Sequence, residues 1–264
     1  MPENTTQRRT TARAMIVLAG LFALAVPPTA IPARAAAADY YDAAAGLSGA
    51  RLKDALHDVI STGTTAISYR RVWDALKVTD EDPSNPDNVI LLYSGFSRAK
   101  ARNGGGVGDW NREHVWPQSH GPFTTGTTPG TDLHHLRPED VRVNSDRGNK
   151  DFDTGGWPAA GAPGNRTDAD SWEPRDAVKG DVARMVFYMA VRYEGGDTRP
   201  DLEVAEGPTH GRTPLLGRLS VLRAWHEKDP VDASERRRNQ IIFDRYQHNR
   251  NPFIDHPEWV DEVF

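Results

Sequence analysis

Segment 109–149 constrains the fold more strongly than any other part of the chain. Residues 112–116 form a short β-prone run, and residues 132–137 form a second one. Pro138 suits the first turn of a helix, acidic residues follow it at the positive helix end, and Gly148 is a natural stop. The segment therefore predicts a strand, a loop, a second strand and a closing helix.

Further helices are predicted where apolar residues recur at helical spacing. They run from Ser48 to Ile60, from Ser68 to Leu76, over 181–193, over 215–225, and from Asp232, with Glu235 as its capping-box partner, past Tyr246. The apolar run 89–93 predicts a buried strand, whereas the polar, proline-containing segments 80–87 and 151–172 predict loops. Several helices flanking a small antiparallel sheet indicate an α+β fold, and no linker divides residues 39–264 into two domains.

Residues 1–38 have the layout of a secretory signal peptide. An arginine-rich start precedes an apolar run over 14–26, and residues 33–35 offer a small-residue cleavage site. The apolar run is shorter than the roughly 20 residues that a membrane-spanning helix needs, although an uncleaved anchor is the alternative. We therefore expect the signal peptide to be removed, and the mature chain, 39–264, to be a secreted, extracellular monomer outside the membrane.

Composition limits both the chemistry and the partners of this chain. Cysteine is absent, which excludes disulfides, thiolate zinc sites and cysteine nucleophiles. Residues 1–38 contain four arginines and one glutamate, so the remaining 28 basic and 36 acidic residues give the mature chain a net charge of −8. Overall charge therefore does not attract it to nucleic acid, and binding to a polyanion would need a local basic patch or a bound cation.

Three side chains in segment 109–149 could together hydrolyse a phosphodiester bond. His114 is a natural general base near neutral pH. Glu113 offers a carboxylate oxygen and Asn144 an amide oxygen, and Mg²⁺ needs few protein ligands because it keeps several waters. Nearby arginines could hold phosphate oxygens through paired hydrogen bonds. We infer a metal-dependent nuclease from this combination.

Three ordered motifs in the same segment resemble the bacterial endonuclease I family. They are Arg112-Glu-His-Val-Trp-Pro117, Asp132-Leu-His-His-Leu-Arg-Pro138 and Val143-Asn-Ser-Asp-Arg-Gly-Asn149. The similarity extends through 172–181 to 249–257, and therefore covers most of the mature chain. Members of this family are secreted or periplasmic non-specific nucleases of the His-Me finger, or ββα-metal, superfamily.

The resemblance implies a ββα-metal core at about residues 110–150, with His114 as the general base. Glu113 and Asn144 become the ligands of Mg²⁺, for which Mn²⁺ or Ca²⁺ would also fit. The implied activity is endonucleolytic cleavage of DNA and RNA with little sequence preference, leaving 5′-phosphate ends. One feature departs from the family: periplasmic members carry a phosphate-holding arginine after the histidine strand, and 115–131 contains none here.

Three arginines are candidates for the missing phosphate contact: Arg137, Arg147 and Arg142. Arg142 and Arg147, with Lys150, could form the local basic patch, but they could equally pair with neighbouring carboxylates. The basic run 235–240 is expected to be a solvated helix face.

Several points stay open from the sequence. Neighbouring side chains on a strand point to opposite faces, so Glu113 and His114 can share one site only if the backbone bulges, twists or ends its strand there. His134 and His135 raise a zinc alternative, which we disfavour because strand neighbours rarely share one metal. A secreted ribonuclease with a restricted substrate range and an inactive nucleic-acid-binding module are the alternative functions.

Overall fold

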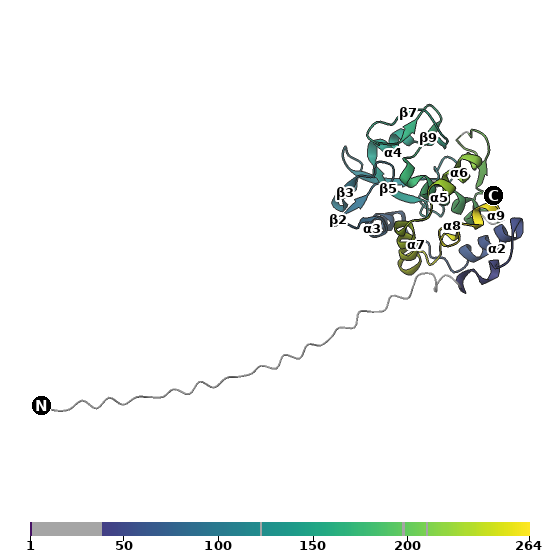
Figure 1. The fold of residues 1–264 in the computed structure, drawn as a ribbon, viewed down its shortest axis with the longest axis horizontal. Helices are drawn as coiled ribbons and strands as arrows, with labels where there is room; N and C mark the ends of the chain where they lie inside the picture. Colours follow the sequence, from purple (N-terminus) through teal and green to yellow (C-terminus); the bar gives the residue numbers. More distant parts are fainter. Residues whose placement is uncertain (2–38, 122, 197–198, 210) are drawn as a thin grey trace. The chain divides into compact units, whose positions relative to one another are not determined.

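The computed structural model describes Met1 and residues 39–121, 123–196, 199–209 and 211–264. The predicted signal peptide, apart from Met1, lies outside the described residues. Helices and small sheets alternate along the described chain, which confirms the α+β class (Figure 1). Within these ranges, no helix combines the length and the apolar character needed to cross a membrane.

The helices range from single turns to the long α2, α5 and α7. They are η1 (Asp39–Ala44), α2 (Gly49–Ser61), α3 (Tyr69–Thr79), η2 (Lys100–Arg102), α4 (Val141–Arg147), η3 (Asp176–Val178), α5 (Lys179–Arg192), α6 (Leu219–Lys228), α7 (Ala233–Arg245), α8 (Pro252–Asp255) and α9 (Trp259–Val263).

The strands are short and form small separate sheets. One sheet contains β1 (Glu81–Asp82), β2 (Asn85–Ile90) and β3 (Ser97–Ala99); an antiparallel pair contains β4 (Trp110–His114) and β5 (Leu136–Asp140); a third sheet, in the order β6-β9-β8-β7, contains β6 (Asp151–Phe152), β7 (Trp157–Pro158), β8 (Arg166–Thr167) and β9 (Ser171–Glu173); and a parallel pair contains β10 (Glu203–Ala205) and β11 (Leu215–Gly217).

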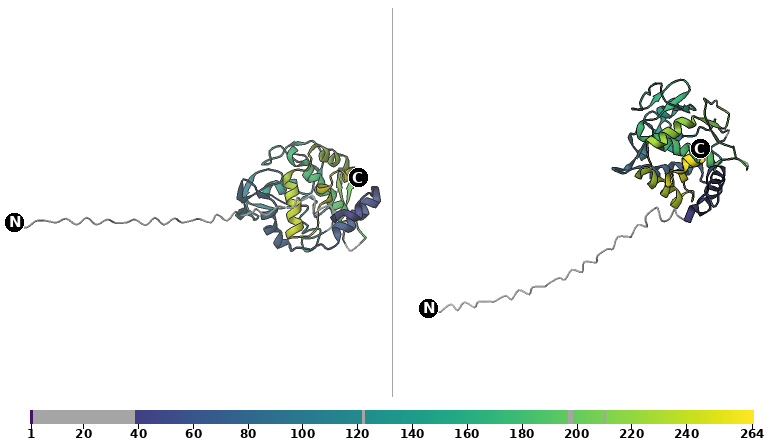
Figure 2. Two further views of the ribbon diagram at one scale, coloured as in Figure 1. Left: turned by 60° about the horizontal axis from the view of Figure 1, so that its bottom comes forward. Right: turned by 45° about the vertical axis from the view of Figure 1, so that its right-hand side comes forward.

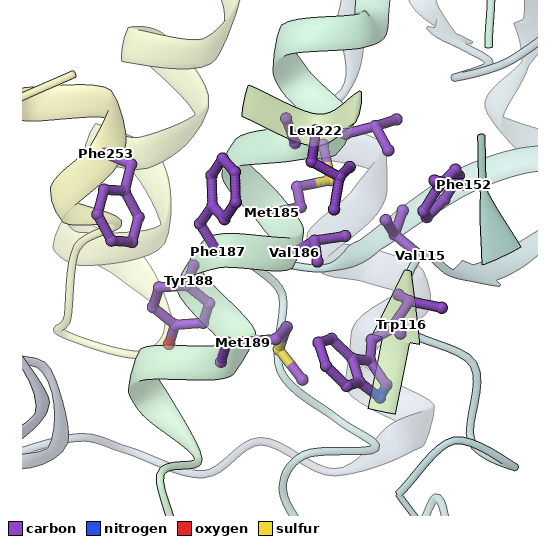
Figure 3. Packing of buried hydrophobic residues seen from close by; sticks show 14 of the residues in the cluster. Val115, Trp116, Phe152, Met185, Val186, Phe187, Tyr188, Met189, Leu222 and Phe253 are labelled. Carbon is purple, nitrogen blue, oxygen red and sulfur yellow. The ribbon is translucent and has the colours of Figure 1, made fainter. Parts of the chain in front are cut away.

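Helix α5 forms the centre of the hydrophobic core, and every one of its residues is buried. A helix enclosed by protein needs apolar side chains on more than one face. Figure 3 shows Met185 of α5 beside Leu222 of α6, while the ring of Phe187 lies 6.0 Å from that of Phe253 in α8. The predicted core helix over 181–193 is confirmed, and α5 begins two residues earlier than predicted.

Buried polar contacts hold α7 in place. Asp232 and Glu235 form the predicted capping box. Glu235 also pairs with Arg184 of α5 at 2.6 Å, and Arg238 donates to two backbone carbonyl oxygens. The expectation of a solvated face over 235–240 is therefore wrong for the inward half of this run, where fixed partners compensate the burial of charge.

The central segment has the predicted order of strand, strand and helix, but its second strand and its helix begin later than predicted. β4 and β5 pair antiparallel over five residue pairs in unbroken register. Pro138 lies within β5 instead of opening the helix, and a two-stranded sheet tolerates it because an edge position does not need its missing N–H. Asp140 is the N-cap of α4 and accepts from two backbone N–H groups, and α4 ends before Gly148 as predicted.

Other differences arise where short strands pair with distant partners. The predicted loops 80–87 and 151–172 contain strands of two sheets. β2 ends at Ile90, so the predicted strand 89–93 is only half confirmed. Residues 215–217 form β11 instead of the start of a helix, because they pair with β10. Local apolar spacing carries no information about such pairing.

Helices α3 and α7 lie side by side (Figures 1 and 2). The N-cap Ser68 of α3 accepts a hydrogen bond from the backbone N–H of Arg71, as its residue type predicts. The Arg71 guanidinium lies 5.9 Å from the ring of Tyr246, which caps the end of α7. The start of α3 therefore meets the end of α7, and the first residue of α3, Tyr69, also reaches His114 of β4.

Candidate active site

A pocket of about 240 Å³ lies at the end of β4, beside α4. Its wall contains Glu113, His114, Pro117, Gln118, Ser119, Asn144, Gly148 and Asn149. Glu113 and His114 both line it, and β4 ends at His114. The structure thus brings the expected base and the two expected metal ligands to one surface.

The imidazole of His114 is held on its Nε2 side. Nε2 lies 3.1 Å from the hydroxyl oxygen of Tyr69 and 2.8 Å from the amide nitrogen of Gln118. Nδ1 is buried and has no hydrogen-bond partner among the described residues. Burial and neighbouring cationic groups lower the pKa of His114 well below its ordinary value. The ring is therefore neutral near neutral pH, which is the form that can accept a proton.

Glu113 is a buried carboxylate with two fixed partners. The hydroxyl group of Tyr93 donates to Oε1 over 2.8 Å, and Nη1 of Arg147 lies 3.3 Å from the same oxygen. Burial nevertheless raises the pKa of Glu113 to about 7. A cation held at this carboxylate would favour its charged form, so that metal binding and ionisation of Glu113 would be coupled.

Asn144, on α4, provides the second oxygen expected to bind a divalent cation. Its Nδ2 donates to Oδ1 of Asn111 over 2.8 Å, which orients the amide and leaves its oxygen to act as a ligand. Carboxylate and amide oxygens suit Mg²⁺, Mn²⁺ or Ca²⁺. In the part of the chain that the structure describes, no group of three or more His, Asp or Glu side chains could hold a metal. One carboxylate and one amide oxygen suit a cation that keeps several waters as ligands.

The three arginines predicted to hold phosphate do not line this pocket. Arg137 is buried in ion pairs with Asp80 at 2.6 Å and Asp181 at 3.3 Å, which leave it no route to a bound phosphate. Arg142 is exposed on α4, outside the pocket wall. None of the three candidates from the sequence is thus part of the pocket wall.

Arg147 has a structural role. It is fully buried and donates to the carbonyl oxygens of His114 at 3.0 Å and Val115 at 2.7 Å. These bonds tie the end of α4 to the end of β4, and the same guanidinium offsets the charge of Glu113. Arg147 therefore holds the backbone of His114 and the carboxylate of Glu113 from inside the protein.

One arginine that the sequence did not single out, Arg212, is bonded through its backbone to a residue of the pocket wall. The backbone N–H of Arg212 donates to the carbonyl oxygen of Ser119 over 2.6 Å. The preceding Gly211 packs so closely on Asn149 that an added Cβ would lie 2.9 Å from its Nδ2. Arg212 has a φ of 83°, a strained left-handed conformation for this residue type. Its exposed side chain makes no hydrogen bond or ion pair with any described residue.

The other polar residues of the motifs are structural. Burial lowers the pKa of His134 and His135 to about 4. The ring of His135 is bonded to the carbonyl oxygen of Pro129 over 3.0 Å. Asp132 accepts hydrogen bonds from two buried tyrosine hydroxyls. These groups stabilise the turn before β5 and do not line the pocket.

Known proteins resemble this chain over most of its length. A family model described as Endonuclease I matches residues 48–258, which include the whole pocket wall. An extracellular ribonuclease of Bacillus amyloliquefaciens is 66% identical over 225 residues, which are 85% of this chain and 78% of the relative. An extracellular ribonuclease of Bacillus subtilis (strain 168) is 64% identical over 225 residues, with the same coverage.

Proposed function

The chain belongs to the endonuclease I family, and we propose that it is a secreted, divalent-metal-dependent endonuclease that hydrolyses both RNA and DNA. The observation that carries this proposal is the single pocket in which a neutral imidazole meets a carboxylate and an amide oxygen. Extracellular function is supported by the names of both relatives. We further propose that β4, β5 and α4 form a ββα-metal core, because α4 sets Asn144 against β4, where its amide is bonded to Asn111.

The residues of the pocket divide the reaction between them. His114 accepts a proton from the water that attacks phosphorus, while the new P–O bond forms and the bond to the 3′-oxygen breaks. Glu113 and Asn144 hold the divalent cation, which when bound supplies positive charge to the phosphate and to the leaving oxygen. Arg147 keeps the backbone of His114 in place. Solvent protonates the 3′-oxygen, and the phosphate remains on the 5′ end of the product.

A water nucleophile allows both RNA and DNA as substrates. RNA is supported by the names of the relatives. DNA is included because a water, and not the ribose 2′-hydroxyl, attacks the phosphorus. Contacts to the phosphate backbone carry little base information, so that cleavage should show little sequence preference.

Cleavage of matched single-stranded RNA and DNA, with Mg²⁺ or with a chelator, tests this function. We expect both substrates to be cleaved to 5′-phosphate ends, and the chelator to reduce the rate at least about a thousandfold. Chelator-resistant cleavage of RNA alone, with 2′,3′-cyclic phosphate ends, would point to a restricted ribonuclease. Binding without cleavage under every condition would point to the inactive binding module.

We propose that Arg212 supplies the phosphate contact for which the sequence candidates are unsuited. Arg212→Ala is expected to lower kcat/KM about a hundredfold, because one donor to a developing oxyanion contributes on that scale. Initial rates on a short RNA measure this effect. Arg142→Ala removes an equally exposed arginine outside the pocket and should change kcat/KM less than threefold. Similar losses in both variants, or no loss in Arg212→Ala, would contradict the assignment.

A further inference from the structure

A second surface suited to a polyanion lies along α7, outside the pocket. We propose that the groove beside α7 binds a single-stranded stretch of the nucleic-acid substrate flanking the bond that is cleaved. This inference rests on the proposed nuclease function and adds a second substrate contact to it. It also supplies the local basic surface that an acidic chain needs in order to hold a polyanion.

The groove has a volume of about 630 Å³, and three arginines of α7 line it: Arg236, Arg237 and Arg245. Glu81 is the one acidic residue of its wall, and it is already paired with Lys100 at 2.5 Å. Val78 and Ile241 add an apolar part to the wall. Arginines around an apolar surface can bind phosphates and pack against bases at the same time.

The arginines on the two sides of α7 differ in whether they have partners within the protein. On the inward side, Arg238 lies 3.4 Å from the carboxylate of Asp80 and is satisfied within the protein. On the groove side, the guanidinium groups of Arg236 and Arg245 are exposed and make no hydrogen bond or ion pair with any described residue. Arg237 makes a long ion pair with Glu81, at 3.6 Å, and donates to the carbonyl oxygen of Thr79 over 3.3 Å. The unpaired positive charge is therefore concentrated on the surface that a ligand can reach.

Side-chain contacts at the start of α3 link one end of the groove to His114. Arg245 lies at this end of the groove, next to Tyr246, whose ring lies 5.9 Å from the Arg71 guanidinium. Two residues before Arg71, the hydroxyl group of Tyr69 lies 3.1 Å from Nε2 of His114. α7 has 13 residues and is therefore roughly 20 Å long, enough for several nucleotides. A strand in the groove would thus lead toward the reacting phosphate.

Binding of single-stranded RNA with Arg236→Glu/Arg245→Glu tests this proposal. The control, Arg51→Glu/Arg166→Glu, makes the same charge change at exposed arginines that do not line the groove. Fluorescence anisotropy is measured with labelled RNAs of about 20 and about 4 nucleotides, chosen because single-strand site sizes start near four nucleotides, and a chelator prevents cleavage.

In the groove variant we expect the Kd of the long RNA to rise about tenfold and the slope of log K against log salt to become shallower by about 1.4, the value for two lost phosphate contacts. The Kd of the short RNA should stay within about twofold, and the control should behave like the unmodified protein. With Mg²⁺ present, kcat/KM should fall for the long RNA only.

Two outcomes would overturn the groove proposal: equal weakening of both RNAs, or the same loss in the control variant. The proposed nuclease function fails in a different way. If a gel showed that the unmodified protein degrades the long RNA in the presence of chelator, the metal dependence would be wrong. If it showed no degradation with Mg²⁺, the nuclease activity would be wrong. The binding experiment and the cleavage experiment therefore separate the two failures.

Discussion

Replacing His114 with alanine is expected to lower kcat about a thousandfold, which corresponds to about 4 kcal/mol of transition-state stabilisation. The imidazole lies in the pocket wall beside Glu113 and Asn144 and is the proposed proton acceptor, and alanine cannot take the proton of the attacking water. Initial rates of RNA cleavage at saturating Mg²⁺ measure the loss. The Mg²⁺ concentration that gives half the maximal rate should change little, since His114 is not proposed as a ligand.

Tyr69→Phe is the matched control for His114→Ala. It removes the hydroxyl group that lies 3.1 Å from Nε2 but keeps the ring that stacks on the imidazole. A loss of one hydrogen bond should lower kcat less than about tenfold. If His114→Ala retained more than a tenth of the activity while remaining folded in a thermal unfolding scan, the assignment of His114 as the base would be wrong.

Glu113→Gln is expected to raise the Mg²⁺ concentration for half-maximal rate at least about a hundredfold, more than the usual cost of losing a second-shell partner. The neutral amide cannot offset the charge of the cation, and the buried Arg147 would then repel it without compensation. Titration of the cleavage rate with Mg²⁺ measures the shift. Breaking a buried ion pair costs about 3 kcal/mol of stability, so Tm is recorded alongside.

Two variants on α4 separate loss of the metal from loss of stability. Asn144→Ala should also weaken Mg²⁺ binding, although it leaves the Glu113–Arg147 pair intact. Asp146→Asn removes an exposed carboxylate from the same helix, outside the pocket wall, and should leave the metal titration unchanged. An unchanged titration in both Glu113→Gln and Asn144→Ala would show that the divalent cation, if one is needed, is held elsewhere.

Local sequence signals identified those parts of the fold whose structure depends on near neighbours. The capping box of Asp232 and Glu235, the N-cap Ser68 and the stop at Gly148 all occur where their residue types predicted them. The buried helix α5 was equally visible, because many apolar residues follow one another at helical spacing. For the two N-terminal caps and the stop at Gly148, the stabilising partner lies within a few residues along the chain.

The strands were predicted less well for a physical reason. A residue such as Pro138 is placed by the strand that pairs with it, and that partner lies far away in the sequence. The same holds for β11, which pairs with β10 although its leucines have helical spacing. Intrinsic strand preference is weak compared with pairing and packing.

For the active site, the order and spacing of the motifs were enough to select Glu113, His114 and Asn144, and the end of β4 at His114 allows them to meet. Residue type alone said nothing about the arginines. Arg137 and Arg147 are enclosed by carboxylates and carbonyl oxygens, whereas the exposed Arg212 comes from a distant segment whose backbone is bonded to Ser119 of the pocket wall. The sequence by itself determined which groups could do the chemistry. Only the tertiary structure decided which arginine side chains are accessible to a phosphate, because the burial and the ion partners of an arginine depend on segments distant along the chain.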